Sequence, residues 1–195
     1  MSSSRSYGIL GGSFDPPQKG HVALALAALR ERSLARVYLV PAAQSPFKKR
    51  GAIASVRERA ALVRAAIRGR PGLSLGAWEI GRAGPSYTYQ TLRFLRKKFP
   101  KRRWELILGE DVWRTFSRWR RGDEIGKHCT VVVGRRAHAG RPPVSTGAVF
   151  LRTRIPAVSS TEIRCALRDG RSVRRWVGDP VAEKIEKMKL YRNLE

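Results

Sequence analysis

Short apolar runs alternate with helical patterns along most of the chain. Several of these runs end at glycine or proline, as buried strands of parallel sheets commonly do. We expect strands at 7–10, 37–40, 73–80, 105–108, 129–133 and 148–151. Helical spacing of apolar residues predicts helices at 21–31, 56–67 (after a Ser55 cap) and 88–98, with two more at 159–168 and 180–188.

Strand, helix and strand in turn indicate parallel βαβ units, and so an α/β fold with a doubly wound parallel sheet. The 195 residues suit one domain, with a core over 1–155 and C-terminal helices over 156–195. The last helix places Val181, Ile185 and Met188 on one side and lysines on the other, which predicts a surface helix that covers the sheet. Residues 135–143 are polar, basic and rich in turn formers, and are expected to form a loop.

Composition narrows the class of protein. The hydrophobic fraction of 42% suffices for a full core, no run approaches the ~18 apolar residues of a membrane span, and the first residues lack an apolar signal core. We therefore expect a cytoplasmic protein without a membrane partner. Cys129 and Cys165 are far apart and only three histidines are present, so ordinary thiols and no protein-bound metal are expected.

The net charge of +25 comes from 30 arginines and 10 lysines against 15 acidic residues. Such a field attracts polyanions, including nucleotides and nucleic acid. An arginine-rich and alanine-rich composition can also reflect the base composition of a genome, so the overall charge does not identify a ligand.

The most informative segment, GGSFDPPQKGH at 11–21, lies between the first strand and the first helix. Gly11 and Gly12 allow a ligand to approach the backbone, and the helix start presents unpaired N–H groups and a positive dipole end. Such a site suits a phosphate, and His21 can donate to its oxygens. The spacing fits neither the GxGxxG loop nor the Walker loop.

Segment 11–21 resembles the GGTFDPxHxGH signature of bacterial nicotinate-nucleotide adenylyltransferases, within the HxGH nucleotidyltransferases. His21 matches the second histidine of HxGH. Gln18 stands where the family has His or Thr, and glutamine donates a hydrogen bond but carries no charge. The segment SPFK at 45–48 resembles the family's PPHK loop, which makes Lys48 an expected phosphate contact.

The resemblance continues toward the acceptor. PSYTYQTL at 85–92 resembles PSYTxxTL, which in the family meets the nicotinate ring and whose backbone N–H groups can bind its carboxylate. Asp111, in a GxD element, is expected to accept from a sugar hydroxyl or a base amine. Trp119 matches a tryptophan that stacks on the pyridine ring. VSSTEIR at 158–164 resembles ISSTxIR, which places a helix cap and Arg164 at the ATP β- and γ-phosphates.

The family resemblance implies an adenylyltransferase that joins nicotinate mononucleotide to ATP, giving deamido-NAD and pyrophosphate by in-line attack on the α-phosphate. Mg²⁺ would bridge the phosphates with few protein ligands. The residues expected at the triphosphate are His21, Gln18, Lys48 and Arg164. Further ATP contacts are expected from Gly11, Gly12, Ser13, Phe14, Ser159, Ser160 and Thr161. Acceptor contacts are expected from Tyr87, Thr88, Asp111 and Trp119.

Two other classes of function stay open at this stage. A related transferase would use another acceptor, such as phosphopantetheine, choline phosphate, glycerol phosphate or nicotinamide mononucleotide. A nucleic-acid-binding protein on the same fold, without catalysis, would account for the basic clusters at 93–98 and 101–103, although solvated helix faces are their simpler explanation. No serine–histidine–carboxylate pattern supports a hydrolase. Self-association, at most weak, is left open.

Overall fold

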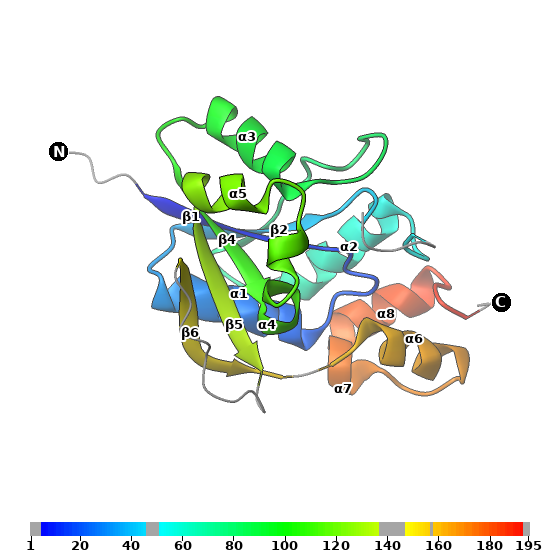
Figure 1. The fold of residues 1–195 in the computed structure, drawn as a ribbon. Coiled ribbons are helices and arrows are strands. Elements are labelled where there is room, and N and C mark those ends of the chain that lie inside the picture. The colour runs from blue at the N-terminus through cyan, green and yellow to red at the C-terminus, as the bar shows by residue number, and fades with distance from the viewer. Residues whose placement is uncertain (1–4, 46–50, 137–146, 157, 193–195) are drawn as a thin grey trace.

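Six strands form one sheet in which every neighbouring pair is parallel. The computed structural model describes residues 5–45, 51–136, 147–156 and 158–192 (Figure 1). The sheet has the order β3-β2-β1-β4-β5-β6. The strands are β1 (Ser6–Gly12), β2 (Arg36–Pro41), β3 (Leu73–Leu75), β4 (Arg103–Gly109), β5 (Thr130–Arg136) and β6 (Ala148–Ile155). This order confirms the doubly wound parallel sheet.

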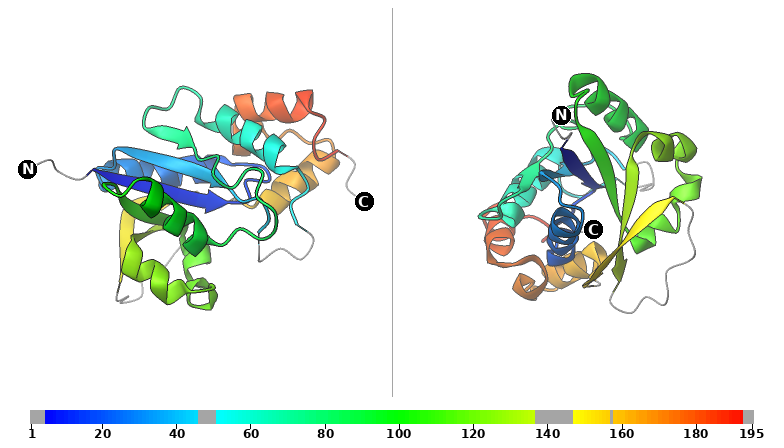
Figure 2. Two further views of the ribbon diagram at one scale, coloured as in Figure 1. Left: turned by 90° about the horizontal axis from the view of Figure 1, so that it is seen from above. Right: turned by 90° about the vertical axis from the view of Figure 1, so that its left-hand side faces the viewer.

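Helices cover both faces of this sheet. They are α1 (Lys19–Glu31), α2 (Val56–Ile67), α3 (Thr88–Lys98), α4 (Glu110–Trp113), the 3₁₀ turn η1 (Phe116–Arg118), α5 (Gly122–His128), α6 (Ser160–Arg168), α7 (Arg174–Val177) and α8 (Asp179–Lys187). Helices α1 and α2 pack on one face and α3 and α5 on the other, and Figure 2 shows the sheet between these layers.

Alternating side chains of the central strands feed both layers of the core. Leu10 and Ile107 point toward α1, whereas their neighbours Ile9 and Leu106 point toward α3. Burial on both faces explains why these strands read as continuous apolar runs and not as alternating patterns.

The expected strand at 73–80 is only partly correct, because β3 ends at Leu75. Beyond it the chain folds into turns, in which Ile80 N–H donates to the Ala77 carbonyl. Trp78 packs against Tyr38, with ring centroids 4.9 Å apart, so its burial does not require an extended backbone. The apolar run therefore continued past the strand without continuing the ladder.

Helix α8 does not cover the sheet, contrary to the sequence prediction. Val181 and Ile185 belong to a third apolar cluster, which they share with Leu62 of α2 and Ile163 of α6. Helices α6, α7 and α8 gather beside α2 at one end of the molecule (Figure 1). An apolar stripe identifies a buried helix face, but it does not identify the surface against which that face packs.

The region expected as a loop at 135–143 begins as strand, because Arg135 and Arg136 continue β5. Residues 137–143 lie outside the described residues. The two cysteines are unpaired and partly buried, and burial raises the pKa of Cys129 to about 12. No helix in the described ranges combines the length and apolar character needed to cross a bilayer.

Candidate active site

A cavity of about 650 Å³ opens where β1 and β4 end. The strand order reverses between these two strands, and ligands of doubly wound sheets bind at such a point. Residues expected at both substrates line this one cavity, namely Gly11, Gly12, Ser13, Tyr87, Thr88, Asp111 and Trp119. The topology thus brings together side chains that are distant in sequence.

The glycine-rich loop leaves open space on one side and packs tightly on the other. A Cβ on Gly11 would meet nothing within 4 Å, whereas a Cβ on Gly12 would lie 3.2 Å from the Phe14 ring. Phe14 has a φ of +50° and its side chain is 2% exposed. The buried phenyl ring therefore packs beneath the loop and supports it, and Phe14 does not line the cavity.

His21 lies in the first turn of α1, with its orientation fixed from both sides. Its Nδ1 accepts a hydrogen bond of 3.2 Å from the Gln18 backbone N–H, and its ring meets the Phe14 ring edge-on at 5.0 Å. Burial, reinforced by the charge of Arg136 and opposed by Asp111, lowers the pKa of His21 from 6.5 to about 4. The imidazole is therefore neutral near pH 7, with Nδ1 as acceptor and Nε2–H as the available donor.

The start of α6 lies against the loop that follows β1. Gln18 Nε2 donates to Ser160 Oγ at 3.4 Å, and that hydroxyl donates to the Pro16 carbonyl at 3.1 Å. Arg164 Nη1 donates to the Asp15 carbonyl at 2.8 Å. The loop after β1 and helix α6 are thus joined directly, by residues 149 positions apart in the case of Asp15 and Arg164.

A capping box defines the start of α6. Ser159 Oγ accepts from the backbone N–H groups of Thr161 and Glu162 at 3.1 and 3.4 Å, and the Glu162 carboxylate accepts from Ser159 N–H at 3.0 Å. The predicted cap is confirmed. Since it occupies these N–H groups, and the Ser160 hydroxyl donates to the Pro16 carbonyl, Arg164 is the side chain of α6 best suited to meet a phosphate.

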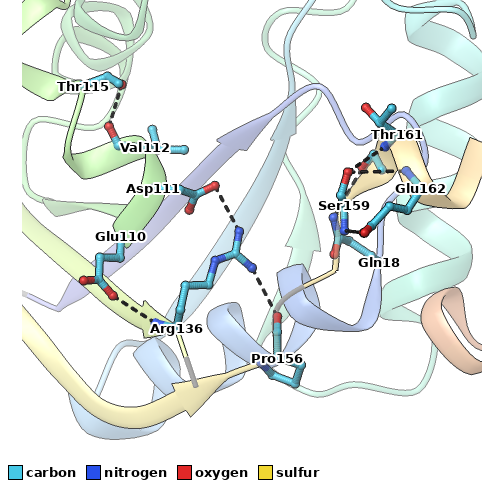
Figure 3. A network of polar contacts seen from close by, with 11 residues as sticks. Gln18, Glu110, Asp111, Val112, Thr115, Arg136, Pro156, Ser159, Thr161 and Glu162 are labelled. Atoms are coloured by element: carbon cyan, nitrogen blue, oxygen red, sulfur yellow. Dashed lines mark hydrogen bonds and ion pairs between the residues drawn. The ribbon is translucent and has the colours of Figure 1, made fainter. Parts of the chain in front are cut away.

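Arg136, at the end of β5, is a site residue that the sequence reasoning missed. Its guanidinium makes an ion pair with Asp111 at 3.0 Å and donates to the Pro156 carbonyl at 3.2 Å, while its backbone N–H donates to the Glu110 carboxylate (Figure 3). It lowers the pKa of His21, which places its charge beside the imidazole. A pair of basic residues, one glycine after a β-branched run and at the carboxyl end of a strand, was the signal available in the sequence.

The part of the cavity where acceptor contacts are expected is built from the start of α3 and the segment around Trp119. Ser86 fixes the turn before α3, because its Oγ accepts from Ala43 N–H at 2.9 Å. The Arg120 guanidinium lies 5.0 Å from the centroid of the Tyr87 ring. Trp119 packs against Phe116, with ring centroids 5.4 Å apart. Aromatic faces and a cation therefore meet at this end.

Glu79 is a buried acid that holds the same wall in place. It is 6% exposed, lines the cavity, and accepts a hydrogen bond of 2.6 Å from the Thr91 hydroxyl. This short bond ties the turns after β3 to helix α3, which carries Thr88 in its first turn. Glu79 was not identified from the sequence, where it is an isolated acid in an apolar run.

Arg59 supports the site from beneath. It is 1% exposed and donates to four carbonyls, of Ala54 at 3.0 Å, Ser13 at 2.6 Å, Ala42 at 2.7 Å and Ala43 at 3.2 Å. It therefore links the loops after β1 and β2 to the start of α2. Arg59 stands on the apolar stripe of a predicted helix, which predicts that it is buried. A buried arginine needs hydrogen-bond acceptors, so this position was a signal of a structural role that the sequence reasoning did not use.

Lys48 lies outside the described residues, so its expected role stays a prediction. Among the residues that the structure describes, no group of three or more histidine, cysteine, aspartate or glutamate side chains could hold a metal ion. Asp111 is already paired with Arg136. Of the polar side chains expected at ATP, those of Gln18, Ser160 and Arg164 are linked to the loop after β1 by direct hydrogen bonds.

The sequence matches the model of the cytidylyltransferase-like family over residues 9–166. It is 37% identical, over 97% of this chain and 95% of the relative, to a probable nicotinate-nucleotide adenylyltransferase of Rhodopirellula baltica. The chain belongs to the nicotinate-nucleotide adenylyltransferase family. It is also 38% identical to the probable family member of Thermus thermophilus, covering 95% of this chain and 98% of the relative. Family membership makes the chain a nucleotidyltransferase.

Solved structures confirm the fold of the family. The Plasmodium falciparum nicotinic acid mononucleotide adenylyltransferase complexed with NaAD matches with a TM-score of 0.78 and 20% identity, covering 98% of this chain and 100% of that one. A putative nicotinate-nucleotide adenylyltransferase from Vibrio parahaemolyticus matches with a TM-score of 0.74 and 21% identity, covering 97% of both chains. At 20% and 21% identity, these matches show that the chain has the same fold.

Proposed function

We propose that this enzyme joins nicotinate mononucleotide to ATP, releasing pyrophosphate and giving deamido-NAD. The observation that carries the proposal is a single cavity with two chemically different ends. The glycine-rich loop and Asp111 line the part that we call the phosphate end, and Tyr87 and Trp119 line the part that we call the ring end. Two nucleotides must meet in such a reaction, one presenting phosphates and the other a flat ring.

At the phosphate end the enzyme supplies donors and charge, because nucleotidyl transfer needs no protein nucleophile. The acceptor phosphate attacks the ATP α-phosphorus, the bond to the β-phosphate oxygen breaks, and pyrophosphate leaves. His21 offers a neutral Nε2–H donor, Gln18 at the start of the same helix has one amide N–H beyond the one bonded to Ser160, and Arg164 reaches the loop from α6. Fixed donors of this kind orient the phosphates and stabilise charge on the leaving group.

At the ring end, two cations favour the acid over the amide. Arg118 and Arg120 both line the cavity, and in the described part of the chain neither makes an ion pair. The carboxylate of a nicotinate ring would gain from their field, whereas a nicotinamide ring would not. Phosphopantetheine and choline phosphate have no aromatic ring to place against Trp119.

Mg²⁺ is proposed as a partner of the ATP phosphates. The few carboxylates near the phosphate end suit an ion held mainly by phosphate oxygens and water, as Mg²⁺ commonly is. Asp111, which lines the cavity and pairs with Arg136, is the side chain that would hold the ion, directly or through water. When bound, the ion would neutralise charge on the phosphates.

The test is pyrophosphate release from ATP with nicotinate mononucleotide, nicotinamide mononucleotide or phosphopantetheine, followed by identification of the product. We expect the highest kcat/KM with nicotinate mononucleotide and deamido-NAD as product. His21→Ala should lower kcat by about 10²-fold while the fold is retained, as for the loss of one transition-state donor. Another preferred acceptor would replace the proposed substrate, and no release with any acceptor would refute the proposal.

A further inference from the structure

The C-terminal segment after α8 reaches the underside of the glycine-rich loop. Tyr191, 4% exposed, donates a hydrogen bond of 2.9 Å from its hydroxyl to Asp15 Oδ1, 176 positions earlier in the chain. Burial and the charge of Asp15 raise the pKa of this hydroxyl, which keeps it protonated as a donor. Nothing in the chemistry described above uses this buried tyrosine.

Asp15 connects this contact to the site. It is 2% exposed, and its carboxylate also accepts from the backbone N–H groups of Ile53 at 2.9 Å and Ala54 at 3.1 Å. Its backbone carbonyl accepts from Arg164 Nη1 at 2.8 Å. One residue therefore receives the C-terminal segment on its side chain and the arginine expected at the triphosphate on its backbone.

Arg164 is left with donors to spare. A guanidinium has five N–H donors, of which one goes to Asp15 and one to Thr161 Oγ1 at 3.2 Å. The two bonds fix the plane of the guanidinium, so a shift of Asp15 would turn its other donors. An arginine that is already oriented before the phosphate arrives binds it more tightly, because a flexible arginine loses conformational entropy when it binds.

We propose that Tyr191 is a positioning residue for ATP, which acts through Asp15 to aim Arg164 at the triphosphate. This inference rests on the proposed ATP site, but not on the identity of the acceptor. The ring of Tyr191 belongs to the apolar cluster that includes Ile163 and Ala166 of α6, and phenylalanine would serve that packing equally well. The hydroxyl, by contrast, would be costly to bury without its carboxylate partner.

The experiment compares Tyr191→Phe with the unaltered enzyme. Affinity for α,β-methylene ATP is measured by titration calorimetry at fixed Mg²⁺, together with KM for each substrate and the thermal midpoint. We expect about five- to tenfold weaker binding of the analogue, the scale of one ordinary hydrogen bond. KM for the acceptor should change less than twofold. Tyr38→Phe is the control, since among the described residues its hydroxyl is hydrogen-bonded to Arg102 at 3.4 Å, by the amino end of β4.

A double-mutant cycle separates positioning from stability. If Tyr191 acts through Arg164, Tyr191→Phe has no further effect on analogue affinity once Arg164→Gln is in place. Additive losses, or unchanged affinity with a lower thermal midpoint, would make Tyr191 a structural residue and overturn the inference. If the enzyme ignores nicotinate mononucleotide while Tyr191→Phe still weakens analogue binding, the proposed acceptor fails and this inference stands.

Discussion

His21 shows how a single residue can be held neutral inside a strongly basic protein. Burial and the nearby charge of Arg136 oppose protonation, and the Gln18 backbone N–H occupies Nδ1. A positive imidazole would attract phosphates more strongly, but a neutral one keeps a donor of fixed direction. Gln18, where the family has His or Thr, likewise contributes a donor without charge.

The lowered pKa of His21 predicts a pH dependence of stability. Between about 6.5 and about 4, the unfolded chain binds the proton of this histidine and the folded protein does not. The folded state is therefore destabilised as pH falls through that range. We expect the free energy of unfolding of the unaltered protein, minus that of His21→Gln, to decrease between pH 7 and pH 4.5 in urea titrations. A difference that is constant across this range would contradict the lowered pKa.

Arg59 predicts a large loss of stability from a conservative change. Arg59→Lys keeps the charge, but one ammonium cannot reach carbonyls from Ser13, Ala42 and Ala54 together. We expect about 2–4 kcal/mol of destabilisation in denaturant titrations, since buried acceptors lose their donors. Arg64→Lys, at an exposed position on the same helix, should change stability by less than about 0.5 kcal/mol. Equal effects of the two variants would refute the supporting role of Arg59.

At the scale of elements, different helices hold the two halves of the cavity. The Ser159 cap fixes α6 at the phosphate end, and the Thr91–Glu79 bond fixes α3 at the ring end. We expect Ser159→Ala to cost about 1 kcal/mol of stability and to raise KM for ATP. Thr91→Val should cost about 1–3 kcal/mol and raise KM for the acceptor.

Steady-state kinetics with each substrate varied in turn check this division. Each variant serves as the control for the other, because both destabilise the fold. The two halves would not be independently supported if both variants raised KM for the same substrate, or if each variant raised KM for ATP and KM for the acceptor equally.

The elements of the core could be predicted because their signals are local. Ser55 caps α2 as expected, Ser159 is the cap of α6 where the sequence allowed Ser159 or Ser160, and α3 has the predicted bounds. Helix α5 and the short α4 and α7 were not predicted, since they carry few apolar residues in regular spacing. The packing of α8 on α2 depends on how a surface is shared between distant segments, which no local pattern encodes.

In the candidate site, too, the residues that could be predicted are those with a local signal in the sequence. The residues of the glycine-rich loop, Arg164 and Trp119 were named because they stand in recognisable motifs. Arg59, Arg136 and Tyr191 were not, although hydrogen bonds or ion pairs connect each of them to residues of those motifs. Their roles arise from contacts across the fold, and the sequence held only indirect signals: the place of Arg59 on a helix stripe and that of Arg136 at the carboxyl end of a strand.

At the scale of the whole molecule, the net charge of +25 exceeds what one triphosphate requires. Such a field will attract RNA without being built for it. We expect binding of a single-stranded RNA, measured by filter retention, to weaken by roughly three orders of magnitude between about 50 and 200 mM salt. Affinity that persisted near physiological salt would favour a nucleic-acid-binding role for the basic surface.

The most direct test of the account is a crystal structure of the enzyme with α,β-methylene ATP and nicotinate mononucleotide. The account predicts phosphate oxygens within hydrogen-bond distance of His21 Nε2 and the Arg164 guanidinium, with the pyridine ring against Trp119. A triphosphate bound elsewhere, with His21 and Arg164 both without contact to it, would contradict the central claim.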